Sequence, residues 1–482
     1  MDLKRRDFIR TTAVAGTAAS LLGSTVLPDI AKAHTNSTRL TKKSVIVAGG
    51  GIGGLCCAYE LMQLGHDVTV LEASGRHGGH VFTGRDGLAD GLYVDYGAEH
   101  FTKPGYDKCW DYIKQFNLTA LPYPRRVDVV RQIEGKFYTE EMLADPEVLK
   151  KFGFNQREIT YLSQNPWWDL ASLYYQPYLD KFTDEYQPFN VGYDQWDTIP
   201  MADIFEKDGA SGTALKFLGG KNTSALFSLW HAAILNLRGV PLAPPDVYRI
   251  KGGNQGLTDS FAQHLGHRLK LSCPILSISH GESGVTVTYR EFGEEKEMSA
   301  DYLANCIPLP AFRRIAIEPA FTEDKQYIID NLSYGTYARV IFQAASEFWL
   351  EDNLSINMQL EHPDIWSMWR VADEVDTQRV ALMGTGPAGV SPLRALAGFK
   401  EIYPGESLNI EQALVKDWPN DSFAPTCERQ AFPMGTLTKF WPQLMQPYGR
   451  IHFAGSYADN LSWGMEAATR SANRVAQEID QA

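Results

Sequence analysis

The feature that most constrains this fold is a glycine-rich turn between a short apolar run and a stretch with helical spacing. Residues 44–48 are largely apolar and β-branched, which predicts a buried parallel strand. A Gly-x-Gly-x-x-Gly pattern runs from Gly49 to Gly54, residues 55–64 have helical periodicity, and 68–71 predict a second strand ending at Glu72. This order predicts a dinucleotide-binding βαβ unit; a glycine-rich turn without a ligand is the alternative.

Each part of the motif has a physical task. Gly49 permits the tight turn, Gly51 lets backbone N–H groups approach a pyrophosphate, and Gly54 allows the helix to pack closely on the strand. The N-terminus of the helix offers partial positive charge to the phosphates. Glu72 is expected to accept hydrogen bonds from the ribose hydroxyls of an adenosine.

Composition indicates a globular protein and argues against nucleic acid and metal ions as ligands. The 482 residues are 44% hydrophobic and 21% charged, which is typical of a globular protein. Lys+Arg 45 against Asp+Glu 58 gives 45 − 58 = −13, so we expect no nucleic-acid partner. The six cysteines include no Cys-x-x-Cys pair, and we expect no metal site.

The N-terminus has the pattern of an export signal. Arg5 and Arg6 precede a weakly apolar stretch, and residues 31–33 offer a small-x-small cleavage site. We therefore predict a twin-arginine signal over residues 1–33, a polar spacer over 34–42, and export of the folded protein to the periplasm by the twin-arginine machinery. An ordinary basic N-terminus and a general secretory signal are the alternatives. No later apolar stretch is long enough to predict a membrane span.

Several further segments carry a family resemblance. Glu72 is followed by a second glycine-rich turn at 75–79, and then by Asp95-Tyr96-Gly97-Ala98. These segments resemble those of the flavin-containing amine oxidase superfamily, which includes the monoamine oxidases and the L-amino-acid oxidases. Further similar segments occur at 248–257, 271–287, 301–308, 449–455 and 463–468.

The resemblance implies FAD as cofactor and a set of flavin contacts. Two of these positions depart from the family pattern, because His80 replaces an arginine and Ser456 replaces an acid. Backbone amides and the helix terminus carry much of the binding in such sites, so we expect it to persist. The predicted cofactor-binding residues are Gly49, Gly51, Ile52, Gly53, Gly54, Glu72, Ala73, Arg76, Gly79, His80, Gly97, Ala98, Glu99, Ile275, Gly455, Ser456, Gly464, Met465 and Ala467.

At the reacting end, the resemblance places Arg339 where the family usually has a lysine near the flavin. The position is set by Phe348-Trp349, nine residues further on. Arginine stays protonated, so it can anchor a water or a carboxylate but cannot act as a base. A surface arginine on a strand is the alternative.

The two positions of the family's aromatic cage are also altered. Cys427 aligns with the cysteine that bonds covalently to flavin in monoamine oxidases; a free core cysteine is the alternative. Glu428 then takes the first cage position, where it would favour a cationic amine, and Trp463 or Gly464 takes the second. The candidate catalytic residues are Arg339, Trp463, Glu428 and His100.

The substrate class depends on Glu99-His100, which stand where L-amino-acid oxidases of the family have a carboxylate-binding arginine. Their presence favours an amine without a carboxylate, although Arg339 or Arg429 offers a replacement. The aromatic residues of 104–244 predict either a pocket wall or ordinary core.

We therefore predict an α/β fold, with a Rossmann-like FAD-binding domain from 43–103, 245–312 and 430–482. An inserted α+β substrate-binding domain would comprise 104–244 and 313–429. The predicted activity is FAD-dependent oxidation of a small-molecule amine to an imine, which water hydrolyses, with reoxidation by O2 to give H2O2 or by a periplasmic electron carrier. The alternatives are an L-amino-acid oxidase, a desaturase or isomerase like the phytoene desaturases, and a non-catalytic flavin-binding redox partner. A homodimer is the candidate assembly.

Overall fold

The computed structural model describes residues 42–350, 355–426 and 428–482. The expected export signal, the spacer up to residue 41 and the candidate covalent link Cys427 lie outside the described residues. Within those ranges, no helix combines the length and the apolar character that crossing a bilayer requires.

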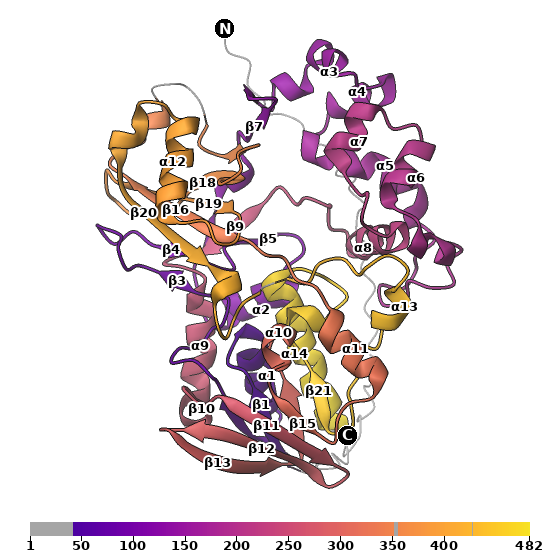
Figure 1. Ribbon diagram of the computed structural model, residues 1–482, viewed down its shortest axis with the longest axis vertical. Helices are drawn as coiled ribbons and strands as arrows, with labels where there is room; N and C mark the ends of the chain where they lie inside the picture. Colours follow the sequence, from indigo (N-terminus) through magenta and orange to yellow (C-terminus); the bar gives the residue numbers. More distant parts are fainter. Residues whose placement is uncertain (1–41, 351–354, 427) are drawn as a thin grey trace, which may run out of the picture. The chain divides into compact units, whose positions relative to one another are not determined.

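A five-stranded parallel sheet carries the predicted βαβ unit. Its strand order is β10-β2-β1-β14-β21, and every neighbouring pair is parallel. The predicted strands and the helix between them are therefore confirmed, and the sheet draws on segments far apart in the sequence (Figure 1). Its elements are β1 (Ser44–Ala48), α1 (Ile52–Gln63), β2 (Asp67–Leu71), β10 (Leu269–Lys270), β14 (Tyr302–Asn305) and β21 (Ile451–Phe453).

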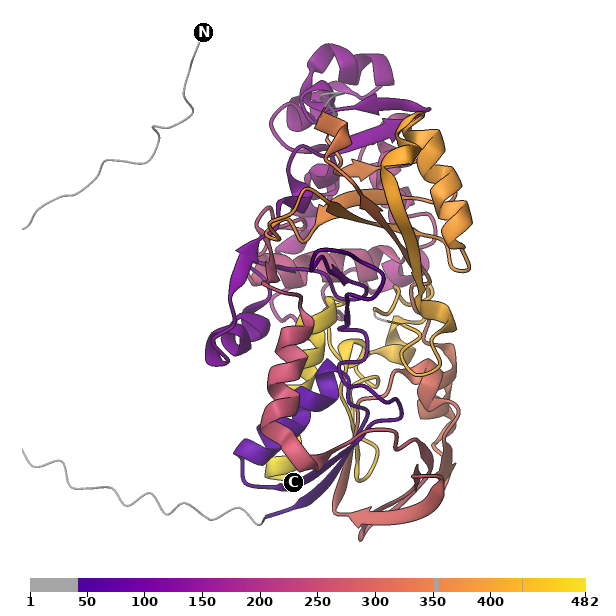
Figure 2. The same ribbon diagram turned by 90° about the vertical axis from the view of Figure 1, so that its left-hand side faces the viewer.

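Both faces of this sheet are covered, which explains why β1 is apolar throughout. Val45 and Val47 point into a core formed with α1, α9 (Gln255–Leu265) and α14 (Gly464–Gln481). Ile46 and Ala48 point to the opposite side, into the core that includes β11 (Ile275–Gly281) and β12 (Gly284–Glu291). Figure 2 shows α1 and α9 together on one side of the sheet. The covering sheet has the order β13-β12-β11-β15, with β13 at Glu294–Ala300 and β15 at Ala316–Glu318.

A seven-stranded sheet is built from other parts of the chain. Its order is β20-β16-β19-β18-β17-β7-β8, and α12 (Pro392–Ile402) packs Phe399 against Phe342 of β16. The fully buried β16 runs antiparallel to both β19 and β20. The strands are β7 (Val130–Ile133), β8 (Lys136–Tyr138), β16 (Ala338–Ala344), β17 (Met358–Gln359), β18 (Ser367–Val371), β19 (Val380–Gly386) and β20 (Ile410–Asp417).

The segment between β8 and β9 is helical, and many of its aromatic side chains form core. Tyr174 and Trp230 are fully buried, which supports the core interpretation for these two residues. Its helices are α3 (Pro146–Phe152), α4 (Gln156–Leu162), α5 (Leu170–Leu179), α6 (Met201–Lys207), α7 (Gly212–Leu218) and α8 (Ala225–Leu237).

The two large sheets follow the predicted domain segments, but they do not decide where one domain ends and the other begins. All strands of the parallel sheet fall in the three segments predicted for FAD, and all strands of the seven-stranded sheet fall in the other two. A small sheet of order β5-β9-β6, from Phe101–Thr102, Val247–Ile250 and Ala120–Pro122, crosses the predicted boundary. The division into two domains therefore stays a prediction.

Candidate functional site

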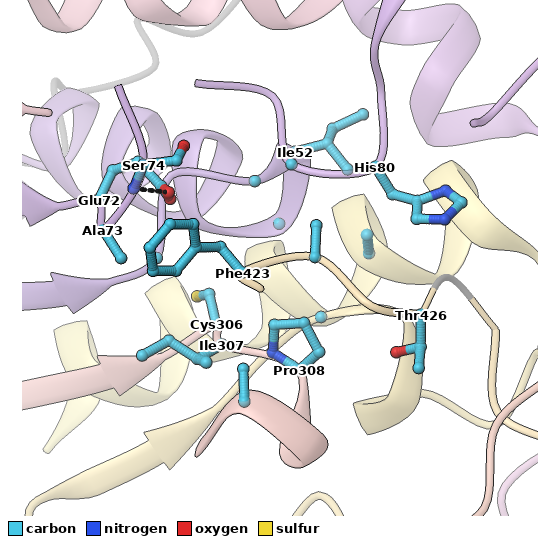
Figure 3. Close-up of a pocket in the computed structure, with 18 of the residues that line it drawn as sticks. Ile52, Glu72, Ala73, Ser74, His80, Cys306, Ile307, Pro308, Phe423 and Thr426 are labelled. Atoms are coloured by element: carbon cyan, nitrogen blue, oxygen red, sulfur yellow. Dashed lines mark hydrogen bonds between the residues drawn. The ribbon is translucent and has the colours of Figure 1, made fainter. Parts of the chain in front are cut away.

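A cavity lies at the carboxyl ends of β1, β2, β14 and β21, where doubly wound sheets bind their ligands (Figure 3). Its wall includes most of the predicted cofactor residues. These are Gly49, Gly51, Ile52, Gly53, Glu72, Ala73, Arg76, Gly79, His80, Ala98, Ile275, Gly455, Ser456, Gly464 and Met465. We call this space the first cavity.

The first glycine turn is shaped by close backbone contacts. Gly49 has a φ of +100°, a conformation that side chains rarely adopt. A Cβ on Gly54 would lie 1.9 Å from the carbonyl oxygen of Gly49, and one on Gly53 would lie 3.2 Å from the Cα of Gly455. Gly54 is thus placed to let the helix approach the turn, and it does not line the cavity itself.

The second glycine turn packs directly on the first. The Gly78 N–H donates to the Gly50 carbonyl at 2.8 Å, and a Cβ on Gly79 would lie 3.0 Å from the Cα of Gly51. Arg76 donates to the Gly79 carbonyl at 2.8 Å, and its guanidinium lies 4.3 Å from the ring centre of Phe82. Arg76 therefore supports the shape of this turn.

Glu72 is held at the end of β2 by two backbone amides. Its carboxylate accepts from the Gly50 N–H at 2.6 Å and from the Ser74 N–H at 2.8 Å. Figure 3 shows Glu72 and Ser74 at one end of the drawn cavity, with His80 and Thr426 at the other. The acid thus lies where the sequence motif expects a ribose, and the polar groups of His80 and Thr426 lie at the far end of the same cavity.

His80 is an uncharged aromatic wall of the first cavity. Its ring stacks on Trp418 with centres 3.9 Å apart, and burial beside Arg339 lowers the pKa of His80 to about 3. Within the described ranges, His80 Nδ1 and the Thr426 hydroxyl are buried without a hydrogen-bond partner. Such atoms need partners, so their presence in the wall suits a polar ligand.

The N-terminus of α14 completes the first cavity. Gly464 and Met465 line it, and the N-cap residue Trp463 makes no side-chain hydrogen bond with the helix. The Glu428 carboxylate accepts from the Gly464 N–H, so the next amides of the helix are the ones that face a ligand. Ala467 does not line the cavity; its neighbour Ala468 does. With the glycine turns and Glu72, these groups fit a bound FAD.

A second cavity adjoins the first. The two share Ala98, Gly464 and Met465, so ligands in the two cavities would meet at these residues. All but one of the candidate catalytic residues line the second cavity, together with two predicted cofactor contacts that do not line the first, Gly97 and Glu99. Its full wall is Gly97, Ala98, Glu99, His100, Tyr106, Arg125, Tyr337, Arg339, Thr385, Glu428, Gly464 and Met465.

Glu99 is the centre of a charged cluster in this wall. Its carboxylate lies 3.1 Å from Arg125, 3.9 Å from Arg339 and 3.2 Å from His100. Burial alone would raise the pKa of Glu99, but Arg125, Arg339 and His100 outweigh it and hold the pKa well below its usual range. Glu99 is thus an ionised counter-charge to the two arginines.

Arg339 is a buried residue of β16, which rules out the surface interpretation. It is 5% exposed and donates to the Gly97 carbonyl at 3.1 Å. Thr385 of β19 is its cross-strand partner and lines the same cavity. Arg429, the other candidate for binding a carboxylate, donates instead to the carbonyls of Asp459 and Asn460 and does not line the cavity.

Glu428 lies beside the start of α14. Its carboxylate accepts from the Gly464 N–H at 3.1 Å, and burial raises the pKa of Glu428 to about 6. Trp463 does not line the second cavity; its ring stacks on Tyr106, which does, with centres 5.5 Å apart. Trp463 therefore supports the wall from behind.

Sequence reasoning missed Arg125, the residue that pairs most closely with Glu99. It lies in a 3-10 turn, Pro124–Arg126, directly after β6. Only the pairing of β6 with β9 brings this turn to the cavity. The run Tyr123-Pro124-Arg125-Arg126 was the available signal, but nothing in it tells which arginine points inward. Also missed were Tyr106, Tyr337 and Thr385 in the second cavity, and Ser74, Cys306, Pro308, Asp421, Phe423 and Thr426 in the first.

Comparisons with known proteins agree with this geometry. Residues 52–480 match the model of a family described as flavin containing amine oxidoreductase. An L-amino-acid oxidase from Notechis scutatus scutatus is 24% identical over 94% of this chain and 90% of its own length. Amine oxidase [flavin-containing] A from Canis lupus familiaris is 24% identical over 90% of this chain and 84% of its own length.

Solved structures share the fold. A putrescine oxidase structure superposes with a TM-score of 0.77 at 19% identity, covering 92% of this chain and all of its own (100%). Cyclohexylamine oxidase from Brevibacterium oxydans IH-35A gives 0.74 at 22% identity, covering 92% and 99%. The expected α/β fold, flavin cofactor and enzyme class are confirmed, and the chain belongs to the flavin-containing amine oxidoreductase family.

Proposed function

We propose that this chain binds FAD in the first cavity and oxidises a small-molecule amine in the second. The observation that carries the proposal is the meeting of the two cavities at Ala98, Gly464 and Met465. When bound, FAD supplies the acceptor for a hydride from the carbon that bears the amine. The resulting imine is hydrolysed by water to a carbonyl compound.

The residues of the chain bind and orient. The glycine turns, Glu72 and the α14 terminus hold the dinucleotide, while the cluster of Glu99, Arg125 and Arg339 forms the charged wall opposite. Glu99 and Arg339 are buried, so this part of the wall limits water around the reacting carbon, which favours the neutral amine.

Reoxidation is the next step that we propose, by O2 with formation of H2O2 or by a periplasmic electron carrier. Arg339 supports the carrier alternative, because a protonated guanidinium positions a water or an anion and takes no proton.

The periplasmic location is part of the same proposal. Its support is the twin-arginine pattern of residues 1–33, with the small residues at 31–33 as cleavage site.

A second candidate function is the oxidation of amino acids. It is favoured by Arg125, which the structure adds to Arg339 in the second cavity, since arginine binds carboxylates in a bidentate manner. Glu99 already pairs with both arginines, so a substrate carboxylate has to compete with it.

The experiment that tests both functions records flavin absorbance without oxygen while purified mature protein is mixed with amines and amino acids. Bleaching by an amine without a carboxylate supports the first function, and admitting air then shows whether O2 is the acceptor. Bleaching by amino acids alone supports the second. A yellow protein that neither class bleaches overturns both and favours a desaturase-like or non-catalytic role.

A further inference from the structure

The two carboxylates that line the second cavity have different partners. Glu99 is paired with Arg125 and Arg339. The Glu428 carboxylate accepts one hydrogen bond, from the Gly464 N–H, and the positive charge of Arg339 also acts on it. Within the part of the chain that the structure describes, it forms no salt bridge. Its side chain is accessible from the cavity that it lines, and the surrounding protein still desolvates its carboxylate. Glu428 is therefore the acid in this wall that remains able to take a positively charged ligand.

The position of Glu428 is set by its hydrogen bond to the start of α14. Gly464, whose N–H it accepts, lines both cavities. The carboxylate thus lies next to the place where a substrate in the second cavity meets a cofactor in the first. A group bound to Glu428 would be at the cofactor side of its cavity.

The other titratable groups around the cavity leave Glu428 as the preferred place for a cation. Arg125 from the 3-10 turn and Arg339 from β16 carry two positive charges against the single negative charge of Glu99. Burial lowers the pKa of His100, so this ring is neutral at neutral pH. Tyr106 and Tyr337 are the remaining titratable side chains of the wall.

We propose that Glu428 binds the ammonium group of the substrate and accepts its proton, so that the amine lies nitrogen-first at the cofactor side. In this step one N–H bond of the substrate breaks and an O–H bond forms on the carboxylate. The products are a neutral amine with a free lone pair and a neutral carboxylic acid. The transfer needs no oxidant, and it rests on the proposed function.

The energetic reason for the transfer is the loss of two charges. In water an alkylammonium, with a pKa near that of lysine at about 10.4, keeps its proton in the presence of a carboxylate. In a cavity poor in water, separated charges are costly and the neutral pair is favoured. Because the pKa of Glu428 is raised to about 6, the group is ionised at neutral pH and binds a proton more readily than an ordinary glutamate.

Binding of cumylamine to the FAD-loaded mature protein tests this role. Cumylamine carries an ammonium group, but its nitrogen-bearing carbon has no hydrogen, so it cannot be dehydrogenated. Calorimetry from about pH 5 to about pH 9 gives the binding affinity over a range that includes the raised pKa of Glu428 and stays below the pKa of the amine. The variants are Glu428→Gln, Glu428→Asp and, as a matched control, Glu466→Gln. Glu466 is a buried acid of α14 that accepts from the amides of Lys108 and Cys109, away from the cavity.

We expect wild-type affinity to fall as the pH drops through about 6, because protonated Glu428 accepts no further proton. Glu428→Gln should bind roughly 10- to 100-fold more weakly at neutral pH, as for a lost charged hydrogen bond. Because this variant has to bind the amine in its neutral form, its affinity should fall about tenfold per unit drop in pH across the whole range, without the change in slope at about pH 6. Glu428→Asp and Glu466→Gln should retain that change in slope. The number of protons released on binding is obtained by calorimetry in two buffers that differ in ionisation enthalpy. Amine binding to Glu428→Gln should release close to one proton more than amine binding to the wild type.

Equal affinity and equal pH dependence in wild type and Glu428→Gln would overturn the role of Glu428, as would the absence of cumylamine binding to the wild type. The proposed function is judged separately, by the bleaching of flavin with oxidisable amines. Failure of this inference and failure of that function therefore give different results.

Discussion

The two cavities are built in different ways. The first is lined largely by glycines, backbone amides and small side chains, and its shape depends on contacts such as that of Gly79 with Gly51. The second is lined largely by charged and aromatic side chains from separate stretches of the chain. Backbone contacts leave little room for substitution, because each added carbon meets a fixed atom. The charged wall has no such steric limit, but each of its charges depends on the others.

The largest effect is expected from Gly54→Ala, which tests the backbone-built cavity. The added Cβ would lie 1.9 Å from the Gly49 carbonyl oxygen, so the turn and the helix must separate. We expect a loss of about 3 kcal/mol or more in stability, together with loss of bound flavin. Thermal unfolding and the flavin-to-protein absorbance ratio measure both. Gly212→Ala is the control, because its Cβ meets nothing within 4 Å. A Gly54→Ala protein that retains flavin and stability would show that the close approach is not needed.

An intermediate effect is expected from Arg125→Met, which tests the charged wall. The pKa of Glu99 is held low by Arg125 and Arg339, so its ionised form stabilises the fold above the ordinary glutamate pKa of about 4.3. Removing Arg125 should cost about 2 kcal/mol at neutral pH. The difference should narrow as the pH falls below about 4, where Glu99 of the variant becomes protonated.

Thermal unfolding of both proteins across this pH range measures the difference. Arg379→Met is the matched control, because Arg379 pairs with Asp90 at 2.8 Å and Glu411 at 2.7 Å but is 40% exposed. An exposed pair of this kind contributes at most about 1 kcal/mol. A loss in Arg125→Met that does not change with pH would mean that its packing on Trp369, 4.1 Å from the guanidinium, matters more than its charge.

The smallest effect is expected from His80→Phe, which keeps the ring on Trp418 and removes the nitrogens. Loss of one neutral hydrogen bond should weaken FAD binding by roughly twofold to tenfold. Because the pKa of His80 is about 3, its ring is uncharged at about pH 6 and at about pH 8. The ratio of the variant's dissociation constant for FAD to that of the wild type should therefore be equal at the two pH values. Fluorescence titration of apoprotein with FAD measures it, with exposed His264→Phe as control. A ratio that grows at the lower pH would indicate a charged ring.

The first cavity was largely predictable because its residues lie in contiguous motifs. The strand, turn and helix of 44–63, the acid at Glu72 and the turn at 75–79 follow one another in the chain, and local patterning indicates each of them. The structure places fifteen of the nineteen predicted cofactor residues that it describes in the wall of this cavity; Cys427 lies outside the described residues. The exceptions are informative: Gly54 lies behind the turn, Gly97 and Glu99 line the second cavity, and Ala467 lies one residue from a lining position.

The second cavity was predictable only in part. Arg339 and Glu428 were placed by family resemblance, and both line it. Trp463 was expected in the wall, but it is the N-cap residue of α14 and stacks on Tyr106 from behind. The next two residues, Gly464 and Met465, line the cavity instead. Arg125 was not predicted, since its turn is some two dozen residues from the nearest motif and reaches the cavity only through pairing of β6 with β9.

The sequence by itself determined the flavin-binding βαβ unit, the family and the identity of the altered residues at the reacting end. Those features depend on local order along the chain, where steric and hydrophobic patterns act over a few residues. Only the tertiary structure decided that Glu99 pairs with two arginines, whereas the Glu428 carboxylate accepts from the Gly464 N–H. Charge pairing acts through space, and the partners here are brought together by strands whose register no local pattern contains.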